Sequence, residues 1–292
     1  MDSVFFQQLI NGLSMGSIYA LIAVGYSMVY GILNMINFAH GEIYMLGAYM
    51  MYACLLSKLG IFGSILISMT VCAVSGMAIE RIAYRPLRNV SRIIPILTAL
   101  AAAQVVRSIV MIIWGSEPLI FPPIFNNEPV ALNSSVKFFP LQILIIGIMI
   151  VAWLFSLWFF KYTKIGKAVR AVSQDQKTAW LMGIQVNRMV LFVYAYGSIL
   201  AAIAGVLVAN YYILIFPLLG FLGTMRAWTA AVLGGIGNLT GAIVGGLLLG
   251  LAESFTMGYI STGYRDAVTF IILIVVLLVM PTGLFKGRGQ KV

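Results

Sequence analysis

Apolar runs of about 20 residues recur along the whole chain, and short polar segments separate them. A transmembrane helix needs roughly 20 mainly apolar residues, so each run predicts one membrane span. The predicted spans are residues 14–33, 38–57, 61–82, 93–114, 139–160, 189–212 and 266–284. The pattern therefore predicts an all-α polytopic membrane protein with about seven full spans.

Residues 226–257 do not fit this pattern. The segment is long for one span but short for two, which would need about 40 residues. We therefore expect a broken or re-entrant helix pair that breaks near Gly237 and Asn238 and returns the chain to the side it came from. Small residues four positions apart also allow two helix backbones to approach closely. The glycines expected to pack helices are Gly237, Gly241, Gly245, Gly246 and Gly250.

The stretch MINFAHGEIYM, residues 35–45, holds the only histidine of the chain. The first two predicted spans leave almost no room for a loop, so residues 34–42 should lie at or just inside the membrane boundary. Non-helical backbone at that depth is tolerated only when it is buried in protein or lines a water-filled cavity. We expect a helix break that presents Asn37 and His40 inward, with Glu42 capping the next helix.

The chain is 62% hydrophobic and 9% charged, whereas soluble domains carry about 25% charge. Residues 81–92, 161–188 and 286–292 hold four, six and three of the 18 Lys and Arg residues. This clustering predicts that all three segments are cytoplasmic. The C-terminus is then inside, and the N-terminus and residues 116–138 are outside. Residues 4–13 become an amphipathic lead-in at the outer surface. The interpretation as a membrane protein explains the net charge of +10 without a nucleic-acid partner.

Charged residues near the spans are few, and charge at membrane depth is costly. We interpret Glu80 as a solvated boundary residue, and Arg107 and Glu253 as structural partners of other helices. Residues 161–188 place apolar residues at helical spacing among Lys and Arg, as in a basic amphipathic helix. This segment either lies on anionic lipid headgroups or docks into a groove of a cytoplasmic partner.

The sequence lacks the motifs that would make it an enzyme. It has no G-x4-G-K-[ST] loop for nucleotide phosphates and no cluster of metal ligands. Cys54 and Cys72 stand alone in apolar stretches, which is typical of core residues. We expect no catalytic residues, no metal and no cofactor.

Residues 16–49, 79–88, 164–184, 229–254 and 276–285 together resemble the permease subunits of ABC importers for branched-chain amino acids. More narrowly, they resemble the first of the two paired permeases of the leucine/isoleucine/valine system. The resemblance covers residues 1–292 as a single transmembrane permease domain in the bacterial inner membrane. It implies alternating access driven by two cytoplasmic ATPase subunits, a second homologous permease and a periplasmic amino-acid-binding protein.

In this family, residues 161–188 correspond to the loop that couples the permease to the ATPase. The general motif E-A-A-x3-G falls on residues 177–183, where the alanine and glycine are kept but the glutamate is not. The residues expected at the ATPase are Asp175, Lys177, Ala179, Trp180 and Gly183. The expected substrate path for a neutral zwitterion includes Asn34, Asn37, His40, Glu42 and Asn238.

Two other functions fit the sequence less well. The same ABC assembly could carry urea, short amides or other neutral amino acids, because related permeases do so. A channel or secondary carrier that works without ATP is the alternative of a different class, but a cytoplasmic docking helix would have no use there.

Overall fold

Almost all of the chain is helical in the computed structural model, which describes residues 2–88, 90, 93–124, 128–133 and 136–285. The helices are α1 (Asp2–Leu33), α2 (His40–Leu56), α3 (Ile61–Ile79), α4 (Ile93–Trp114), α5 (Pro140–Tyr162), α6 (Lys164–Gln174), α7 (Gln176–Leu181), α8 (Val186–Tyr212), α9 (Leu219–Gly234), α10 (Leu239–Tyr259) and α11 (Arg265–Val279). Short helical turns cover Glu80–Tyr84, Arg85–Leu87 and Thr262–Tyr264. The strands are β1 (Leu119–Ile120), β2 (Val130–Asn133), β3 (Val136–Phe138) and β4 (Leu214–Ile215).

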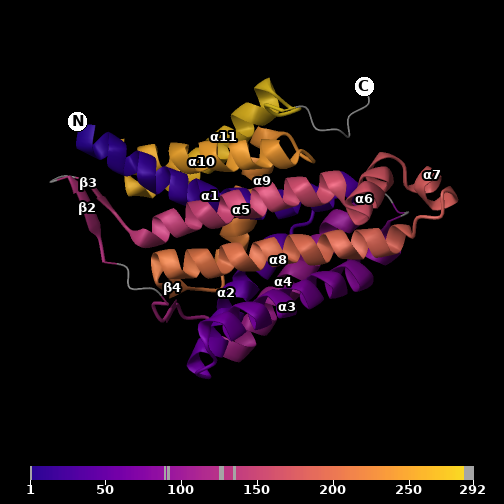
Figure 1. Cartoon of the computed structure of the whole chain (residues 1–292), viewed down its shortest axis with the longest axis horizontal. Coiled ribbons are helices and arrows are strands. Elements are labelled where there is room, and N and C mark those ends of the chain that lie inside the picture. Colours follow the sequence, from indigo (N-terminus) through magenta and orange to yellow (C-terminus); the bar gives the residue numbers. More distant parts are fainter. Residues whose placement is uncertain (1, 89, 91–92, 125–127, 134–135, 286–292) are drawn as a thin grey trace.

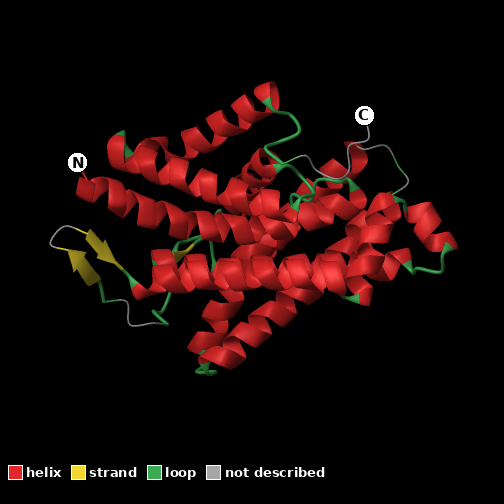
Figure 2. Cartoon of the chain, turned by 45° about the horizontal axis from the view of Figure 1, so that its top comes forward, coloured by secondary structure: helices red, strands yellow, loops and turns green. Residues whose placement is uncertain are grey.

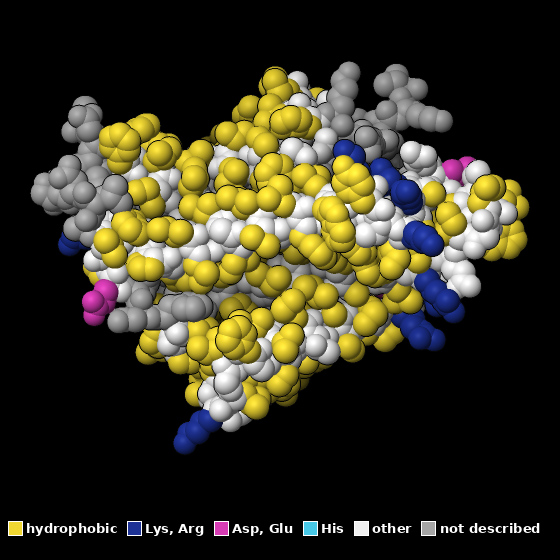
Figure 3. All heavy atoms as spheres, viewed as in Figure 1, with side chains coloured by type: hydrophobic (Ala, Val, Ile, Leu, Met, Phe, Trp, Pro, Cys, Tyr) yellow, Lys and Arg dark blue, Asp and Glu magenta, His cyan; other side chains and the backbone are white. Residues whose placement is uncertain are grey.

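The long helices run between two ends of the molecule that differ in charge (Figure 1). Lys and Arg side chains gather at the end that carries α6 and α7, which we call the basic end (Figure 3). The opposite end carries the antiparallel β2–β3 hairpin, and we call it the hairpin end (Figure 2). Apolar side chains cover the surface between the two ends, as expected for a protein that lies in lipid.

Seven of the described helical segments are long and apolar enough to cross a membrane. The fold class predicted from the sequence is therefore confirmed. Helices α2 and α9 have only 17 and 16 residues, or about 25 Å at 1.5 Å per residue. Both are shorter than the roughly 30 Å hydrocarbon core. Of the pair expected over residues 226–257, only α9 is short, because α10 reaches 21 residues.

Helix α1 lies at the centre of the bundle and packs against α5, α8, α9 and α10. Its contact with α10 is close because small residues meet there: Gly16 lies against Gly250, and Ala20 against Gly246. Residues 4–13 do not form a separate surface segment, which corrects the expected lead-in. They continue α1 without a break because Gln8 accepts a hydrogen bond from the Ser254 hydroxyl of α10 (2.7 Å).

Two breaks interrupt the helices, and both fall where the sequence predicted them. The first covers residues 34–39, where Asn34 takes a left-handed conformation (φ 51°). The second covers residues 235–238, where Gly235 and Gly237 have φ values of 104° and 86°. Gly237 therefore belongs to the turn. Gly241 and Gly245 pack against Gly234 and Ala230 across that turn.

Short helical turns over residues 80–87 continue α3 without a loop. Glu80 is fully buried and forms an ion pair with Arg88, so its interpretation as a solvated boundary residue is wrong. Helical turns over residues 80–87 bring the Arg88 guanidinium back to the carboxylate, a contact that hydropathy alone does not reveal. The basic segment 286–292 lies outside the described residues.

Candidate functional site: the crossing of two short helices

The start of α2 is fixed by Asn37. Its side-chain Oδ1 accepts hydrogen bonds from the Ala39 backbone N–H (3.1 Å) and from the Tyr84 hydroxyl (3.0 Å). An asparagine that accepts a backbone N–H two residues later is a common way to begin a helix. The same side chain thus starts α2 and ties it to the end of the α3 segment.

His40 is the first residue of α2 and is buried between two long helices. Its ring lies against Gly25 of α1 and within 6.1 Å of the Tyr26 ring. Gly25 in turn lies against Gly197 near the middle of α8. The chain therefore returns from the end of α1 into the interior of the bundle before α2 begins. One hydrogen bond joins the imidazole to the Ile22 backbone, while Nε2 has no hydrogen-bond partner.

Glu42 lies in the first turn of α2, where the positive end of a helix favours a carboxylate. It does not cap that helix, because Oε1 forms an ion pair with Arg107 of α4 instead. The Arg107 guanidinium also lies 5.8 Å from the Phe221 ring centroid of α9. The carboxylate is 1% exposed and the guanidinium 18%, so the pair reaches the surface only through the arginine.

Helices α2 and α9 cross at two glycines. Gly41 lies against the Gly220 carbonyl and the Thr224 hydroxyl, and Gly220 lies against Glu42. Any side chain on Gly41 would overlap backbone atoms of α9. Thr224 also donates a hydrogen bond to the Phe38 carbonyl (3.3 Å), which links α9 to the break before α2. The positive ends of two short helices therefore meet inside the bundle.

Asn34 and Asn238 do not join this crossing. They line an open groove of about 1180 Å³ at the basic end. Its walls come from the last turns of α1 and α5, from α6, and from the turn between α9 and α10. The structure thus divides the expected path residues into a buried group (Asn37, His40 and Glu42) and a groove pair.

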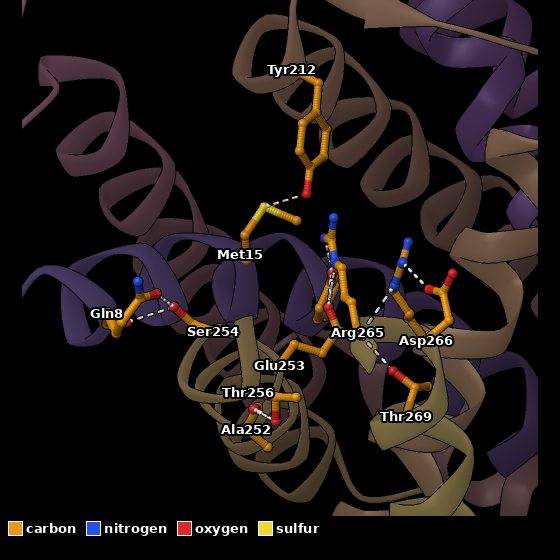
Figure 4. A network of polar contacts seen from close by, with 12 residues as sticks. Gln8, Met15, Tyr212, Ala252, Glu253, Ser254, Thr256, Arg265, Asp266 and Thr269 are labelled. Atoms are coloured by element: carbon orange, nitrogen blue, oxygen red, sulfur yellow. Dashed lines mark hydrogen bonds and ion pairs between the residues drawn. The ribbon is translucent and has the colours of Figure 1, made fainter. Parts of the chain in front are cut away.

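A second set of buried charges surrounds Glu253 near the hairpin end (Figure 4). Its carboxylate accepts hydrogen bonds from Tyr19 (2.6 Å), Thr269 (2.5 Å), Arg226 (3.2 Å) and Arg265 (3.0 Å). These residues come from α1, α11, α9 and α11. Arg226 also pairs with Asp266 (2.6 Å), so two acids face two arginines. Glu253 joins four helices, in agreement with the structural role expected of it.

The loop at the basic end forms two helices, α6 and α7. Asp175 begins α7 by accepting hydrogen bonds from the backbone N–H groups of Lys177 (2.8 Å) and Thr178 (3.3 Å). The Thr178 hydroxyl and these N–H groups hold the pKa of the Asp175 carboxyl below its usual value. Gly183 ends α7 in a left-handed conformation (φ 83°).

The tip of this loop is apolar although none of the residues that the structure describes covers it. Ala179 is buried against the bundle, but Trp180, Leu181 and Met182 are 68%, 75% and 77% exposed. Exposed apolar clusters at helix ends are typical of surfaces that bind another protein.

The long apolar helices and the buried ion pairs define a multi-pass α-helical membrane protein, and in the described residues there is no cluster that could hold a metal ion. The sequence profile of the family described as "Branched-chain amino acid transport system / permease component" matches residues 8–277. The chain belongs to this family of permeases.

Individual relatives agree with this assignment. The chain is 42% identical to the high-affinity branched-chain amino acid transport system permease protein LivH of Escherichia coli K12, over 98% of this chain and 96% of the relative. It is 41% identical to BraD of Pseudomonas aeruginosa, over 98% and 97%. Among solved structures, PsaBC from Streptococcus pneumoniae in complex with Fab has a TM-score of 0.52 and 14% identity, and covers 99% of this chain and 98% of its own. That likeness concerns the fold alone.

Sequence reasoning missed the partners of the site residues. Arg107 and Glu42 are 65 positions apart, and Gly41 and Gly220 are still farther apart along the chain. A usable signal was present, since charges inside spans usually pair with one another. That rule predicts the existence of ion pairs but does not choose between possible partners.

Proposed function

We propose that the chain is a permease subunit of an ATP-binding-cassette importer that carries branched-chain amino acids across the bacterial inner membrane. The observation that carries this proposal is the 42% identity to LivH over nearly the whole of both chains. ATP is hydrolysed by separate cytoplasmic subunits, and the chain itself carries no catalysis. A second homologous permease and a periplasmic amino-acid-binding protein complete the assembly.

The basic end is the cytoplasmic side in this proposal. The clusters of Lys and Arg at that end support the orientation through the positive-inside rule (Figure 3). The N-terminus then lies outside, the C-terminus lies in the cytoplasm, and the hairpin end receives the binding protein. Helix α7 docks on an ATPase subunit through Trp180, Leu181 and Met182, whose exposed apolar side chains need a partner.

The substrate path borders the crossing of α2 and α9. Arg107 supports this position, because it is a partly exposed charge on a helix whose exposed residues are mostly apolar. A charged side chain inside a span usually faces a water-filled cavity or another subunit. Asn37 and His40 do not take part in the crossing itself. They contact Tyr84 and α1 and so position the start of α2. Asn34 and Asn238 lie where the path reaches the basic end.

Reconstitution tests the proposal. Proteoliposomes that hold this chain, its second permease, the ATPases and the binding protein should accumulate radiolabelled leucine only when ATP is supplied on the ATPase side. Vesicles that hold the permeases without ATPases serve as the control and should show no accumulation. Leucine flux through the permeases alone, without ATP, would show that the chain is a channel or secondary carrier.

A further inference from the structure

The groove at the basic end has Lys and Arg side chains along one wall and no acidic side chain among its described lining residues. Lys161, Lys167 and Arg170 line it from α5 and α6, and the described lining residues include no Asp or Glu. A neutral amino acid carries an ammonium group as well as a carboxylate. The groove offers no carboxylate to an ammonium, so its charge does not match the proposed substrate.

The packing of α6 on α5 brings these cations to one wall of the groove. Gly166 packs directly on the backbone of Phe159 and Phe160, so that α6 turns back against the end of α5. Arg170 then donates a hydrogen bond to the Lys161 carbonyl (3.2 Å), which fixes its guanidinium beside the groove. The fold therefore fixes Arg170 beside the groove, while Lys161 and Lys167 are exposed on the same wall.

The rest of the groove is suited to an amphiphile. Met28, Leu157 and Phe160 supply apolar walls, and Trp158 and Tyr162 add aromatic rings that are 54% and 62% exposed. Trp and Tyr at the end of a span mark the level of the lipid headgroups. The groove thus combines an apolar lower part with a cationic rim at the height where headgroups lie.

Two buried polar atoms at the groove have no hydrogen-bond partner. Ser27 is 1% exposed, and its hydroxyl makes no hydrogen bond within the chain. The Nε of Arg170 is also buried and makes no hydrogen bond within the chain. Both atoms are buried within the chain, so the groove presents its lysines and the outer nitrogens of Arg170 to a ligand, and not these two atoms.

From these contacts we propose that the groove binds an anionic phospholipid, with the phosphate between Lys161, Lys167 and Arg170 and the acyl chains along α1 and α5. Basic pockets between membrane helices bind such headgroups in general. The crossing of α2 and α9 contributes none of the lining residues, and the groove meets the proposed substrate path only at Asn34 and Asn238, across from the cationic wall.

The test is a titration of phosphatidylglycerol into the detergent-purified transporter complex, followed by native mass spectrometry. Each cation near a membrane surface contributes roughly fivefold to the affinity for an anionic lipid. A variant with Lys161→Gln, Lys167→Gln and Arg170→Gln should therefore bind phosphatidylglycerol on the order of 100-fold more weakly. The single variants Lys167→Gln and Arg170→Gln should each lose roughly fivefold, which keeps the test valid if the triple variant is unstable.

Lys164→Gln is the matched control, because Lys164 is an exposed cation of α6 that does not line the groove. It should bind phosphatidylglycerol as the unchanged chain does. Equal binding of phosphatidylglycerol by the triple variant and the unchanged chain would overturn the proposal. Equal affinity of the unchanged chain for phosphatidylcholine would also overturn it, because that lipid carries no net charge.

Discussion

The Tyr19 hydroxyl of α1 donates a hydrogen bond to the Glu253 carboxylate of α10 across 2.6 Å. Three more donors surround the same carboxylate, which is 1% exposed. Such a network is stable only while the charges balance, because an arginine left alone in a buried site is costly.

Glu253→Gln should therefore destabilise the bundle by about 3–5 kcal/mol, since it removes the anion that faces Arg226 and Arg265. Thermal unfolding of the detergent-purified complex measures the effect. Asp266→Asn is the matched control, because Asp266 also pairs with Arg226 but is 55% exposed. Its effect should be within about 1 kcal/mol. Equal melting temperatures for Glu253→Gln and the unchanged chain would contradict the proposed role of the network.

The contact of Gly41 with Gly220 gives a second prediction. A methyl group on Gly41 would overlap the Gly220 carbonyl and the Thr224 hydroxyl, so α2 and α9 would have to separate. We expect Gly41→Ala to cost about 1–3 kcal/mol and to slow leucine uptake. Gly63→Ala is the control, because a methyl group there would meet no atom within 4 Å apart from the neighbouring backbone of its own helix. If Gly41→Ala supports uptake at the rate of the control, the crossing is not a tight contact in the working transporter.

Gly183 tests the docking role of α7. Gly183→Lys should leave the chain in the membrane but uncouple ATP hydrolysis from leucine uptake, because a long cation would stand beside the apolar tip. Gly115→Lys is a close control: Gly115 also has a positive φ (88°) and open space around it, but it lies at the hairpin end. The ratio of ATP hydrolysed to leucine transported is the measurement. Similar ratios in the two variants would argue against docking through α7.

The orientation is tested by cysteine labelling in intact cells. A cysteine at Ser116, near the hairpin end, should react with a membrane-impermeant maleimide from outside. A cysteine at Lys177, in α7, should react only after the cells are opened. The native Cys54 and Cys72 are buried, so the unchanged chain gives the background. The reverse labelling pattern would show that the basic end faces outward.

The sequence predicted six of the seven candidate spans and both breaks because those features depend on local properties. The exceptions are 38–57, which is the short helix α2, and Leu239–Tyr259, which is long enough to span by itself. The length of apolar runs indicates where helices cross, and a run too short or too long for its spans indicates a break. The predicted range 93–114 agrees with α4 (Ile93–Trp114), and the break near Gly237 lies between α9 and α10.

The contacts of the site could not be predicted in the same way, because they join distant segments. Glu42 is the clearest case. It was expected to cap α2, whereas Arg107, 65 positions away on another helix, takes its carboxylate. Glu80 was missed for a local reason: its neighbours in sequence suggested a hydrated boundary, but the helical turns after α3 bury it against Arg88, eight positions on. In both cases an ion pair that hydropathy does not reveal decided the environment.

The small β1–β4 ladder connects two loops that are far apart in the sequence. Leu119 and Ile120, in the loop between α4 and α5, pair with Ile215 and Leu214, only four residues before α9 begins. Backbone hydrogen bonds therefore join the loop between α4 and α5 to the segment that leads into the first turn of α9, where Gly220 meets α2. In the proposed importer, a binding protein docked at the hairpin end would therefore contact a loop that is hydrogen-bonded to the segment just before α9, and through α9 would reach the crossing with α2.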